Sequence, residues 1–332
     1  ANPDCFKADY TITMFAIKTG MLLNDGLDVC GEIHTAYLGA PESIVDEISH
    51  IHVLEREDIE LFFPERKRRT SKFDYGRVLV IAGSKQYPGA AALTANAAIV
   101  AGAGLVQLYS TCFHASILPE VILRQVPETE EGTISEKALD FILTDAEKAK
   151  AIVIGPGLGN SKETENFVKL LIEKLPSDLP LLIDADALKA VSGEVKLRNN
   201  IVLTPHSGEF SRLTDIGREE IEKSSFQSAK QWAEKLNCTI LLKGVPTIIT
   251  DGVYSYFNIN GNPGMASGGS GDVLSGIIGA LLAQGFETLE ACALGAFLHA
   301  DAGDRYAGQF AEQTLTASAL IDFLQLTFSN KD

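Results

Sequence analysis

The chain has 332 residues, 45% of them hydrophobic, and carries a formal net charge of -16 at pH 7. This length and hydrophobic content exclude a disordered chain and suffice for one large domain or two ordinary ones. The negative charge disfavours general binding to nucleic acids, because their phosphates would be repelled. The longest apolar stretch near a helix, Val273 to Ala283, is about half of what a bilayer crossing needs, so we expect no membrane span.

The cysteines and histidines form no pattern that is typical of disulfides or of a transition-metal site. The five cysteines lie far apart without a CxxC pair, and the six histidines include no HExxH motif. This usage fits a reducing compartment, so we expect a cytoplasmic protein. We assign no metal-binding residue, and expect any metal to arrive with a nucleotide.

The first part of the chain predicts a small separate piece. Tyr10 to Phe15 and Glu32 to Leu38 alternate as strands do, and the segment Lys18 to Gly31 between them is rich in turn residues. Two strands are marginally stable alone, which indicates the tail of another domain or a packing arm. From Glu47 to Lys72 the charge density rises and the apolar periodicity fades, as in a connector.

From Gly76 onward, apolar strands, glycine turns and helices alternate. Arg77 to Ala82 predicts a buried strand, Gly83 to Gly89 a loop, Ala90 to Gly102 a helix and Leu105 to Tyr109 the next strand. This order is a βαβ unit.

The same pattern continues along the chain. Further strands are predicted at Ala151 to Ile154, Leu181 to Ile183, Ile201 to Leu203 and Thr239 to Leu242, with helices near 162–175, 207–214 and 219–236. A hairpin of Thr247 to Thr250 and Val253 to Phe257 follows, and three helices end the chain. The fold class is therefore α/β, with a central, mostly parallel sheet and helices on both faces.

A glycine-rich stretch from Asn262 to Gly276 opens the first of these three helices. The backbone N–H groups at such a helix start can surround an anion, and we predict an anion hole at Gly268, Gly269, Ser270 and Gly271. No P-loop motif occurs in the chain. Asp272 would lie beside a bound phosphate, where it could accept a proton from an attacking hydroxyl; the alternative is that it only caps the helix.

This stretch, GNPGMASGGSGDVLSG, resembles the glycine-rich motif of the ADP/ATP-dependent NAD(P)H-hydrate dehydratases of the ribokinase-like superfamily. Seven more blocks resemble the family in the same order: YGRVLVIAGS (75–84), YPGAA (87–91), AGAGLV (101–106), IGPGLG (154–159), LIDADAL (182–188), TPHSGEF (204–210) and LKGVPT (242–247). The resemblance covers about residues 70–328 and implies a ribokinase-like fold.

The resemblance also implies two groups of binding residues. Contacts to the hydrated nicotinamide substrate would come from Ala90, Ala91, Gly157, Gly159, Asp184 and His206. Contacts to the adenine nucleotide would come from Lys243, Gly244, Val245, Pro246, Thr247 and Gly271. The alternatives assign no ligand contact: Asp186, beside Asp184, would be a helix cap, His206 a structural histidine and Lys243 a solvated loop lysine.

The first 40 residues are similar to the final strands of the NAD(P)H-hydrate epimerase domain that precedes the dehydratase in fused bacterial proteins. We therefore divide the chain into an epimerase tail at 1–48, a linker at 49–72 and the dehydratase domain at 73–330. The tail alone should not epimerise a substrate, and K⁺ is expected only with a complete epimerase domain.

The function implied is ADP-dependent dehydration of the C6 hydrates of NADH and NADPH, which yields AMP and phosphate and uses Mg²⁺. Asp272 would be the general base. ATP is the alternative nucleotide, a ribokinase-like kinase of a small alcohol is the alternative enzyme, and a nucleotide-binding regulatory protein is the rival from another class. We also expect a homo-oligomer. The apolar helix Leu289 to Leu298 could pack between its subunits, and a partner could supply the missing epimerase portion.

Overall fold

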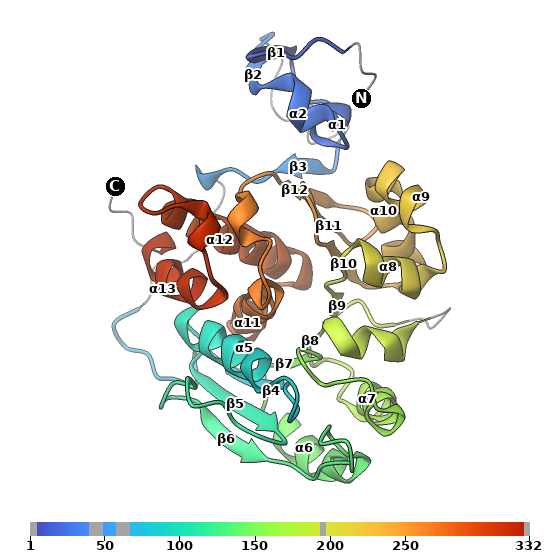
Figure 1. The fold of residues 1–332 in the computed structure, drawn as a ribbon, viewed down its shortest axis with the longest axis vertical. Helices are drawn as coiled ribbons and strands as arrows, with labels where there is room; N and C mark the ends of the chain where they lie inside the picture. The colour runs from blue at the N-terminus through green and yellow to red at the C-terminus, as the bar shows by residue number, and fades with distance from the viewer. Residues whose placement is uncertain (1–4, 40–48, 58–66, 193–196, 329–332) are drawn as a thin grey trace.

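The computed structural model describes residues 5–39, 49–57, 67–192 and 197–328 and contains one large sheet with helices on both faces (Figure 1). The spatial order of its strands is β3-β12-β11-β10-β9-β8-β7-β4-β5-β6. The strand bounds are β3 Ile51–Val53, β4 Arg77–Ile81, β5 Leu105–Ser110, β6 Ile122–Gln125, β7 Ala151–Ile154, β8 Leu181–Ile183, β9 Ile201–Leu203, β10 Thr239–Leu242, β11 Thr247–Thr250 and β12 Ser255–Asn258. Within this sheet only β11 runs antiparallel to its neighbours.

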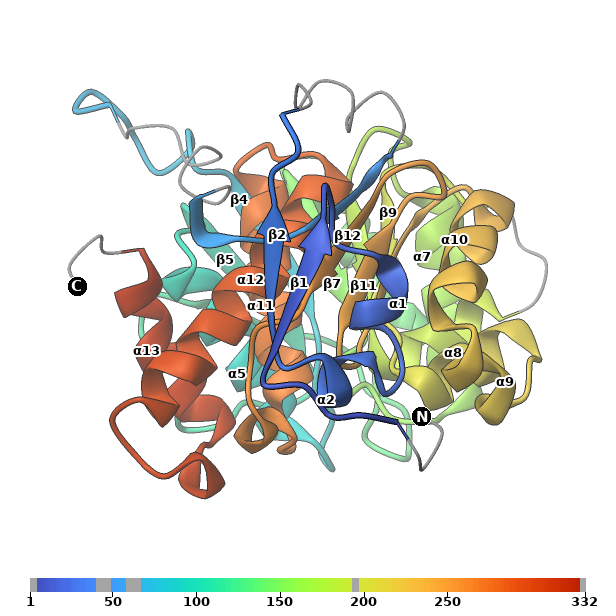
Figure 2. The ribbon, with the colours of Figure 1, turned by 90° about the horizontal axis from the view of Figure 1, so that it is seen from above.

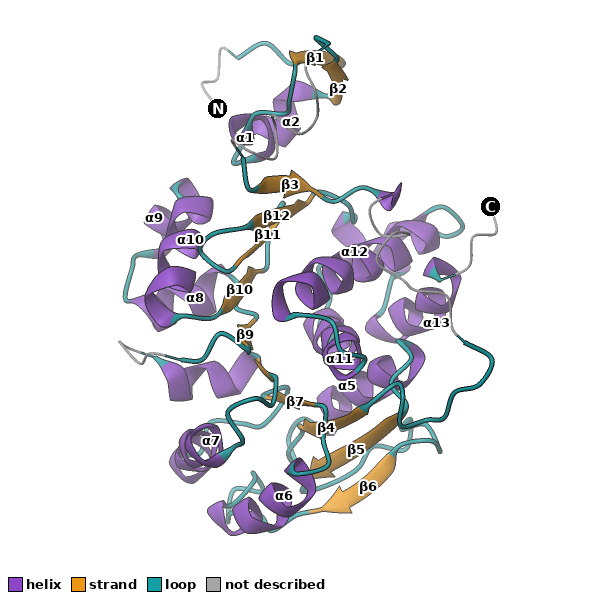
Figure 3. Cartoon of the chain, turned by 180° about the vertical axis from the view of Figure 1, so that it is seen from behind, coloured by secondary structure: helices purple, strands orange, loops and turns teal. Residues whose placement is uncertain are grey.

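The helices form two layers (Figures 1 and 3), with α5 and α11 to α13 on one face and α6 to α10 on the other. Their bounds are α5 Pro88–Val100, α6 Leu139–Ala146, α7 Lys162–Lys174, α8 Ser207–Thr214, α9 Arg218–Lys223, α10 Ser225–Leu236, α11 Ser270–Ala283, α12 Thr288–Ala307 and α13 Ala317–Thr327, with 3-10 turns η1 Glu136–Ala138, η2 Ala185–Val191, η3 Pro263–Met265 and η4 Glu312–Thr314. None of the helices in the described ranges is long and apolar enough to cross a membrane.

Each layer has its own hydrophobic core, and the central strands contribute to both. In β4, Val78 and Val80 belong to the core under α5 and α11, whereas Leu79 and Ile81 belong to the core under α6 and α7. Alternate side chains of a strand point to opposite faces, so a strand covered on both sides is apolar throughout. This explains why β4 reads as a continuous apolar run.

The predicted strands from β7 to β10 and the hairpin of β11 and β12 are confirmed. The helix predicted at 219–236 is interrupted at Ser224 and forms α9 and α10. The elements β6 and α6 were not predicted. All four residues of β6 are exposed, since β6 is an edge strand, and its sequence therefore lacks the apolar run of a central strand.

Helix α12 contains the segment that we expected to pack between subunits. Leu294 and Leu298 of this helix are buried within the chain itself, in the core formed with α11 and α13. That expectation is therefore wrong for these side chains, which fill the interior of the domain.

The N-terminal piece is a small unit of two strands and two helices. Strands β1 (Tyr10–Met14) and β2 (Glu32–Ala36) pair in parallel, and the short helices α1 (Thr19–Leu22) and α2 (Gly26–Cys30) connect them. The segment that we expected to be turn-rich thus contains both helices, because a parallel pair requires a crossover connection. Figure 2 shows this unit lying over the β3 and β12 end of the large sheet.

The segment predicted as a linker contributes an edge strand of the large sheet. Strand β3 pairs in parallel with β12, and His52 lies opposite Tyr256. Leu54, directly after β3, is only 2% exposed. Arg56 contacts Asp301 of α12 and lies 5.7 Å from the centre of the Phe297 ring. Residues 51–56 are therefore attached to the domain of the large sheet by backbone pairing, apolar burial and an ion pair.

Candidate active site

The sequence blocks that we singled out meet at one edge of the large sheet. Gly83 follows β4, Gly155 follows β7, Asp184 follows β8, His206 lies shortly after β9 and Lys243 follows β10. These strands are parallel to one another, so their carboxyl ends lie at the same edge. Open α/β sheets bind ligands at this edge.

The residues predicted to form an anion hole lie at the amino terminus of α11. Gly269 precedes the helix with a φ of +92°, and a Cβ at this position would lie 2.5 Å from Leu93 Cδ1, so this position requires glycine. The Ser270 N–H donates to Ser267 O at 3.3 Å. In the described part of the chain, no acceptor is found for the backbone N–H groups of Gly268, Gly269, Gly271 and Asp272. These groups are available to an anion at the positive end of the helix dipole.

Asp272 lies in the first turn of α11, within this group of N–H donors. Burial raises its pKa to about 7, the nearby Asp184 carboxylate adds to the rise, and the Lys243 ammonium opposes it. A carboxylate with a pKa near neutrality can both accept and release a proton at physiological pH. The environment of Asp272 is therefore compatible with transfer of a proton near neutral pH.

Asp184 is almost completely buried, with 1% of its surface exposed. Lys243 Nζ lies 2.9 Å from Asp184 Oδ1, and the Ser275 hydroxyl donates to Asp184 Oδ2 at 2.8 Å. Burial by itself would lower the pKa of Lys243, but the carboxylates of Asp184 and Glu209 hold it above its usual value. Lys243 thus remains charged, only 3.5 Å from the position that a Cβ on Gly271 would occupy.

The loops expected to contact the substrate lie against one another. A Cβ on Gly157, which has a φ of +63°, would come 2.8 Å from Ala90 Cβ. The Ser84 hydroxyl donates to Gly157 O at 2.8 Å, and the Gly159 N–H donates to Asp186 Oδ2 at 2.8 Å. These two hydrogen bonds therefore hold the loop of Gly157 and Gly159 close to α5. Ala91, next to Ala90, is completely buried.

His206 forms the amino-terminal cap of α8. Its Nδ1 accepts the Gly208 N–H at 3.0 Å, and its own backbone N–H donates to Glu209 Oε2 at 2.8 Å. Burial lowers the pKa of His206, which favours the neutral ring. The structure therefore gives this residue a structural role, as the alternative to substrate contact proposed, and the cap itself was not predicted; Nε2 lies 3.6 Å from Glu209 Oε1.

The predicted nucleotide loop connects β10 to β11. Gly244 is exposed and Val245 is 83% exposed, whereas Pro246 is buried. The Thr247 hydroxyl donates to Gly244 O at 3.0 Å and closes the loop on itself. The loop thus presents an apolar side chain to solvent beside Lys243.

Three polar residues at this site were missed by the sequence analysis. Ser275 and Glu209 contact the Asp184–Lys243 pair, and His299 Nε2 lies 3.1 Å from the Ser270 hydroxyl. Burial lowers the pKa of His299 to about 4, so its ring is neutral at pH 7. Only Ser275 had a sequence signal, since it lies one helical turn after Asp272.

No cluster of three or more histidine, cysteine or acidic residues that could hold a metal occurs within the described ranges. The described residues at the sheet edge that could contact a metal ion are therefore single carboxylates, not a cluster. Asp186 and Asp272 lie close enough to influence each other electrostatically, and neither is paired with Lys243.

The comparisons with other sequences agree on one family. Residues 78–326 match the family model of the NAD(P)H-hydrate dehydratases. The chain is 36% identical to the bifunctional NAD(P)H-hydrate repair enzyme of Moorella thermoacetica, over 98% of this chain and 63% of that enzyme. It is 35% identical to the enzyme of the same name from Escherichia coli, over 96% and 60%. The chain therefore spans about three-fifths of the length of these curated relatives.

Solved structures confirm the fold. A ribokinase-like superfamily protein of Enterococcus faecalis has a TM-score of 0.73 at 28% identity, over 84% of this chain and 95% of that protein. The ADP/ATP-dependent NAD(P)H-hydrate dehydratase of Bacillus subtilis, co-crystallised with ATP and Mg²⁺, has a TM-score of 0.71 at 28% identity, over 83% and 97%. The fold is thus ribokinase-like, and with a family match over most of its length the chain belongs to the NAD(P)H-hydrate dehydratase family.

Proposed function

We propose that this chain dehydrates the C6 hydrates of NADH and NADPH in a reaction driven by an adenine nucleotide. The observation that carries the proposal is the position of Asp272, whose pKa is raised to about 7, among unpaired N–H groups at the start of α11. This arrangement joins a general base to an anion-binding helix terminus, as phosphoryl transfer to a hydroxyl requires. The function named for the Bacillus subtilis relative is the same.

In the proposed reaction, Asp272 accepts the proton of the C6 hydroxyl while the hydroxyl oxygen attacks the terminal phosphoryl group of ADP. The bond to the α-phosphate oxygen breaks and AMP leaves. The N–H groups of Gly268, Gly269 and Gly271 stabilise the charge on the transferred phosphoryl group. The lone pair of the ring nitrogen then expels phosphate from C6, and loss of a C5 proton restores the 1,4-dihydropyridine.

For the nucleotide we propose ADP, with ATP as the alternative. Lys243 would place its positive charge near the phosphates, and the exposed Val245 would lie against the adenine ring. Mg²⁺ prefers oxygen ligands and keeps several waters, so Asp186 would hold the ion through water while Asp272 stays available as the base. Bound with the nucleotide, Mg²⁺ neutralises phosphate charge.

For Asp184 we propose a role that differs from substrate binding. Both of its carboxylate oxygens are bonded within the protein, to Lys243 and to Ser275. It would therefore act on the reaction by holding Lys243 in place and by raising the proton affinity of Asp272.

For residues 1–48 we propose the tail of an epimerase domain, as in relatives named bifunctional. The outer face of β1 leaves Tyr10, Ile12 and Met14 exposed, which suits a sheet face that a further helix covers. We propose that an epimerase portion covers this face, and binding of a separately produced epimerase fragment to this chain is the test. We further propose a homo-oligomer, which light scattering would measure.

The test of the main function is the recovery of absorbance at the reduced-nicotinamide band. Hydrated NADH, Mg²⁺ and either ADP or ATP are added to the chain, and phosphate release is measured in parallel. We expect NADH and phosphate in equal amounts, and about a 100-fold lower turnover for Asp272→Asn. A stable phosphorylated product without recovered NADH would instead identify a kinase, and bound nucleotide without any turnover would identify a regulatory protein.

A further inference from the structure

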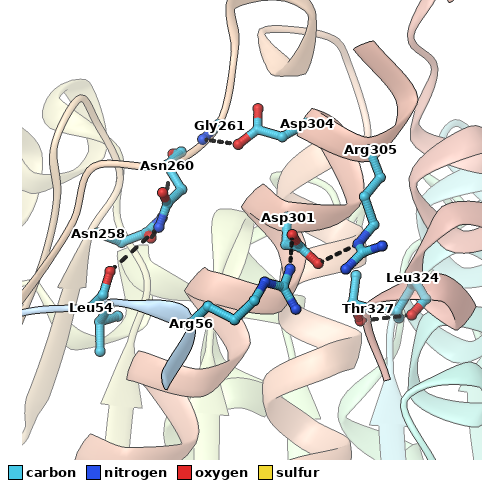
Figure 4. A network of polar contacts seen from close by, with 10 residues as sticks. All are labelled: Leu54, Arg56, Asn258, Asn260, Gly261, Asp301, Asp304, Arg305, Leu324 and Thr327. Atoms are coloured by element: carbon cyan, nitrogen blue, oxygen red, sulfur yellow. Dashed lines mark hydrogen bonds and ion pairs between the residues drawn. The ribbon is translucent and has the colours of Figure 1, made fainter. Parts of the chain in front are cut away.

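The loop Gly261 to Gly269, which leads into the anion hole, is attached at its start to α12. Asp304 Oδ2 accepts the Gly261 N–H at 2.8 Å (Figure 4), and Asp304 Oδ1 accepts the Asn262 Nδ2–H at 2.9 Å. Asn262 Oδ1 in turn accepts the Gly264 N–H at 3.1 Å. One carboxylate thus fixes two successive residues of the loop, and the second of them fixes the turn η3.

The other end of the loop is attached to the same helix. The Ser270 hydroxyl lies 3.1 Å from Nε2 of His299, which is five residues before Asp304 on α12. Between the two attachments the loop packs directly on the helix, since a Cβ on Gly303 would come 2.6 Å from Met265 Sδ. Helix α12 therefore supports the loop at its beginning, middle and end.

We propose that Asp304 is a positioning residue for the anion hole, an inference that rests on the function proposed above. The N–H groups of Gly268 and Gly269 can stabilise a transferred phosphoryl group only if they are held in one direction before the reaction. A glycine-rich loop without attachments loses much conformational entropy when it is ordered. The bonds from Asp304 remove this freedom at the start of the loop, without contact to the reacting atoms.

The same helix offers a matched control. Asp301 lies one turn before Asp304 and pairs with Arg56 and with Arg305, whose Nε is 2.8 Å from Asp301 Oδ2. Figure 4 shows these ion pairs directed away from the loop. Substitution of Asp301 should therefore affect the stability of the domain without changing the anion hole.

The decisive experiment exchanges the two bonded side chains. Asp304→Asn places amide N–H groups of both residues opposite each other, and Asn262→Asp places two carboxylates opposite each other. The double variant restores the bond with its direction reversed, because Asn at 304 can donate to Asp at 262 and still accept from Gly261. The kcat for hydrated NADH, the dissociation constant for ADP with Mg²⁺ and the Tm are measured for the wild type, both single variants, the double variant and Asp301→Asn.

We expect each single variant to lower kcat about tenfold and to weaken ADP binding about threefold. The double variant should return both values to within about threefold of the wild type, and Asp301→Asn should lower the Tm with unchanged kcat. Single variants with unchanged kcat and ADP binding, or a double variant that recovers neither, would overturn the role of Asp304. If the wild type itself recovers no NADH, the proposed function fails, and the ADP dissociation constants alone decide on Asp304.

Discussion

Lys243 Nζ lies 2.9 Å from Asp184 Oδ1, beside the helix terminus that bears Asp272, in an ion pair whose carboxylate is almost fully buried and whose lysine side chain is 23% exposed. Removal of the lysine alone would leave a buried carboxylate without a counter-ion, which typically costs about 3–5 kcal/mol. We expect Lys243→Met to lower the free energy of unfolding by about this amount. The double variant Lys243→Met with Asp184→Asn should lose clearly less, since it buries no charge. Urea denaturation of both variants measures the difference, and equal losses would contradict the pairing.

The pH dependence of turnover should report the proton affinity of Asp272. Burial raises the pKa of this group to about 7, so the base is protonated and inactive below that pH. We expect kcat/KM, which reports ionisations of the free enzyme, to decrease about tenfold per pH unit below pH 6 and to level off above pH 8. ADP binding, measured over the same range, serves as the control for loss of the folded site. If the rate instead decreased only near pH 4, the titrating group would be a carboxylate with an ordinary pKa, which would contradict the assignment to Asp272.

The contact between Gly157 and α5 should control access of the substrate. In Gly157→Ala the new Cβ would lie 2.8 Å from Ala90 Cβ, and one of the two loops must shift. We expect the KM for hydrated NADH to rise about tenfold, because small displacements of positioning groups have large kinetic effects. Gly285→Ala is the matched control: its φ is also positive, at +97°, but the space around it is open. A similar KM for both variants would show that the effect comes from backbone strain alone.

The attachment of the N-terminal segment should contribute measurably to stability. Leu54 is 2% exposed, and Leu54→Ala should lower the free energy of unfolding by about 2–5 kcal/mol. Tyr37 is 75% exposed, and Tyr37→Ala should change the free energy of unfolding by less than about 0.5 kcal/mol. Chemical denaturation followed by tryptophan fluorescence compares the two variants. A loss for Leu54→Ala as small as that for Tyr37→Ala would mean that residues 51–56 are not held as described.

The fold could be predicted from the sequence because its signals are local. The apolar runs of the central strands, the glycines after them and the periodic helices each follow from a few adjacent residues. Strand β3 was not predicted, because three residues in a charged segment are too few to show an alternation of apolar and polar residues. Only their pairing with β12 makes them a strand. Strand β6 was not predicted either, because its side chains are exposed and therefore need not be apolar.

The sequence placed the candidate residues at one sheet edge but predicted only part of their contacts. Gly269 and Asp272 were singled out because glycines before a helix have a direct physical meaning. The pairing of Asp184 with Lys243 joins residues 59 positions apart, and the contact of His299 with Ser270 joins residues 29 apart. Separations of this kind leave no local pattern in one sequence. The capping bonds of His206 are local, to Gly208 and Glu209, but they were not predicted, because histidine is not among the usual N-cap residues.

The pairing of β3 with β12 has a practical consequence for work with fragments of this chain. A fragment that begins at residue 73, the start of the domain by sequence criteria, would expose the backbone N–H and C=O groups of β12 along Ser255 to Phe257. Uncovered backbone of this kind is a template for intermolecular strand pairing and aggregation. Insolubility of such a fragment would therefore say nothing about the catalytic domain, and a truncation should begin upstream of Ile51.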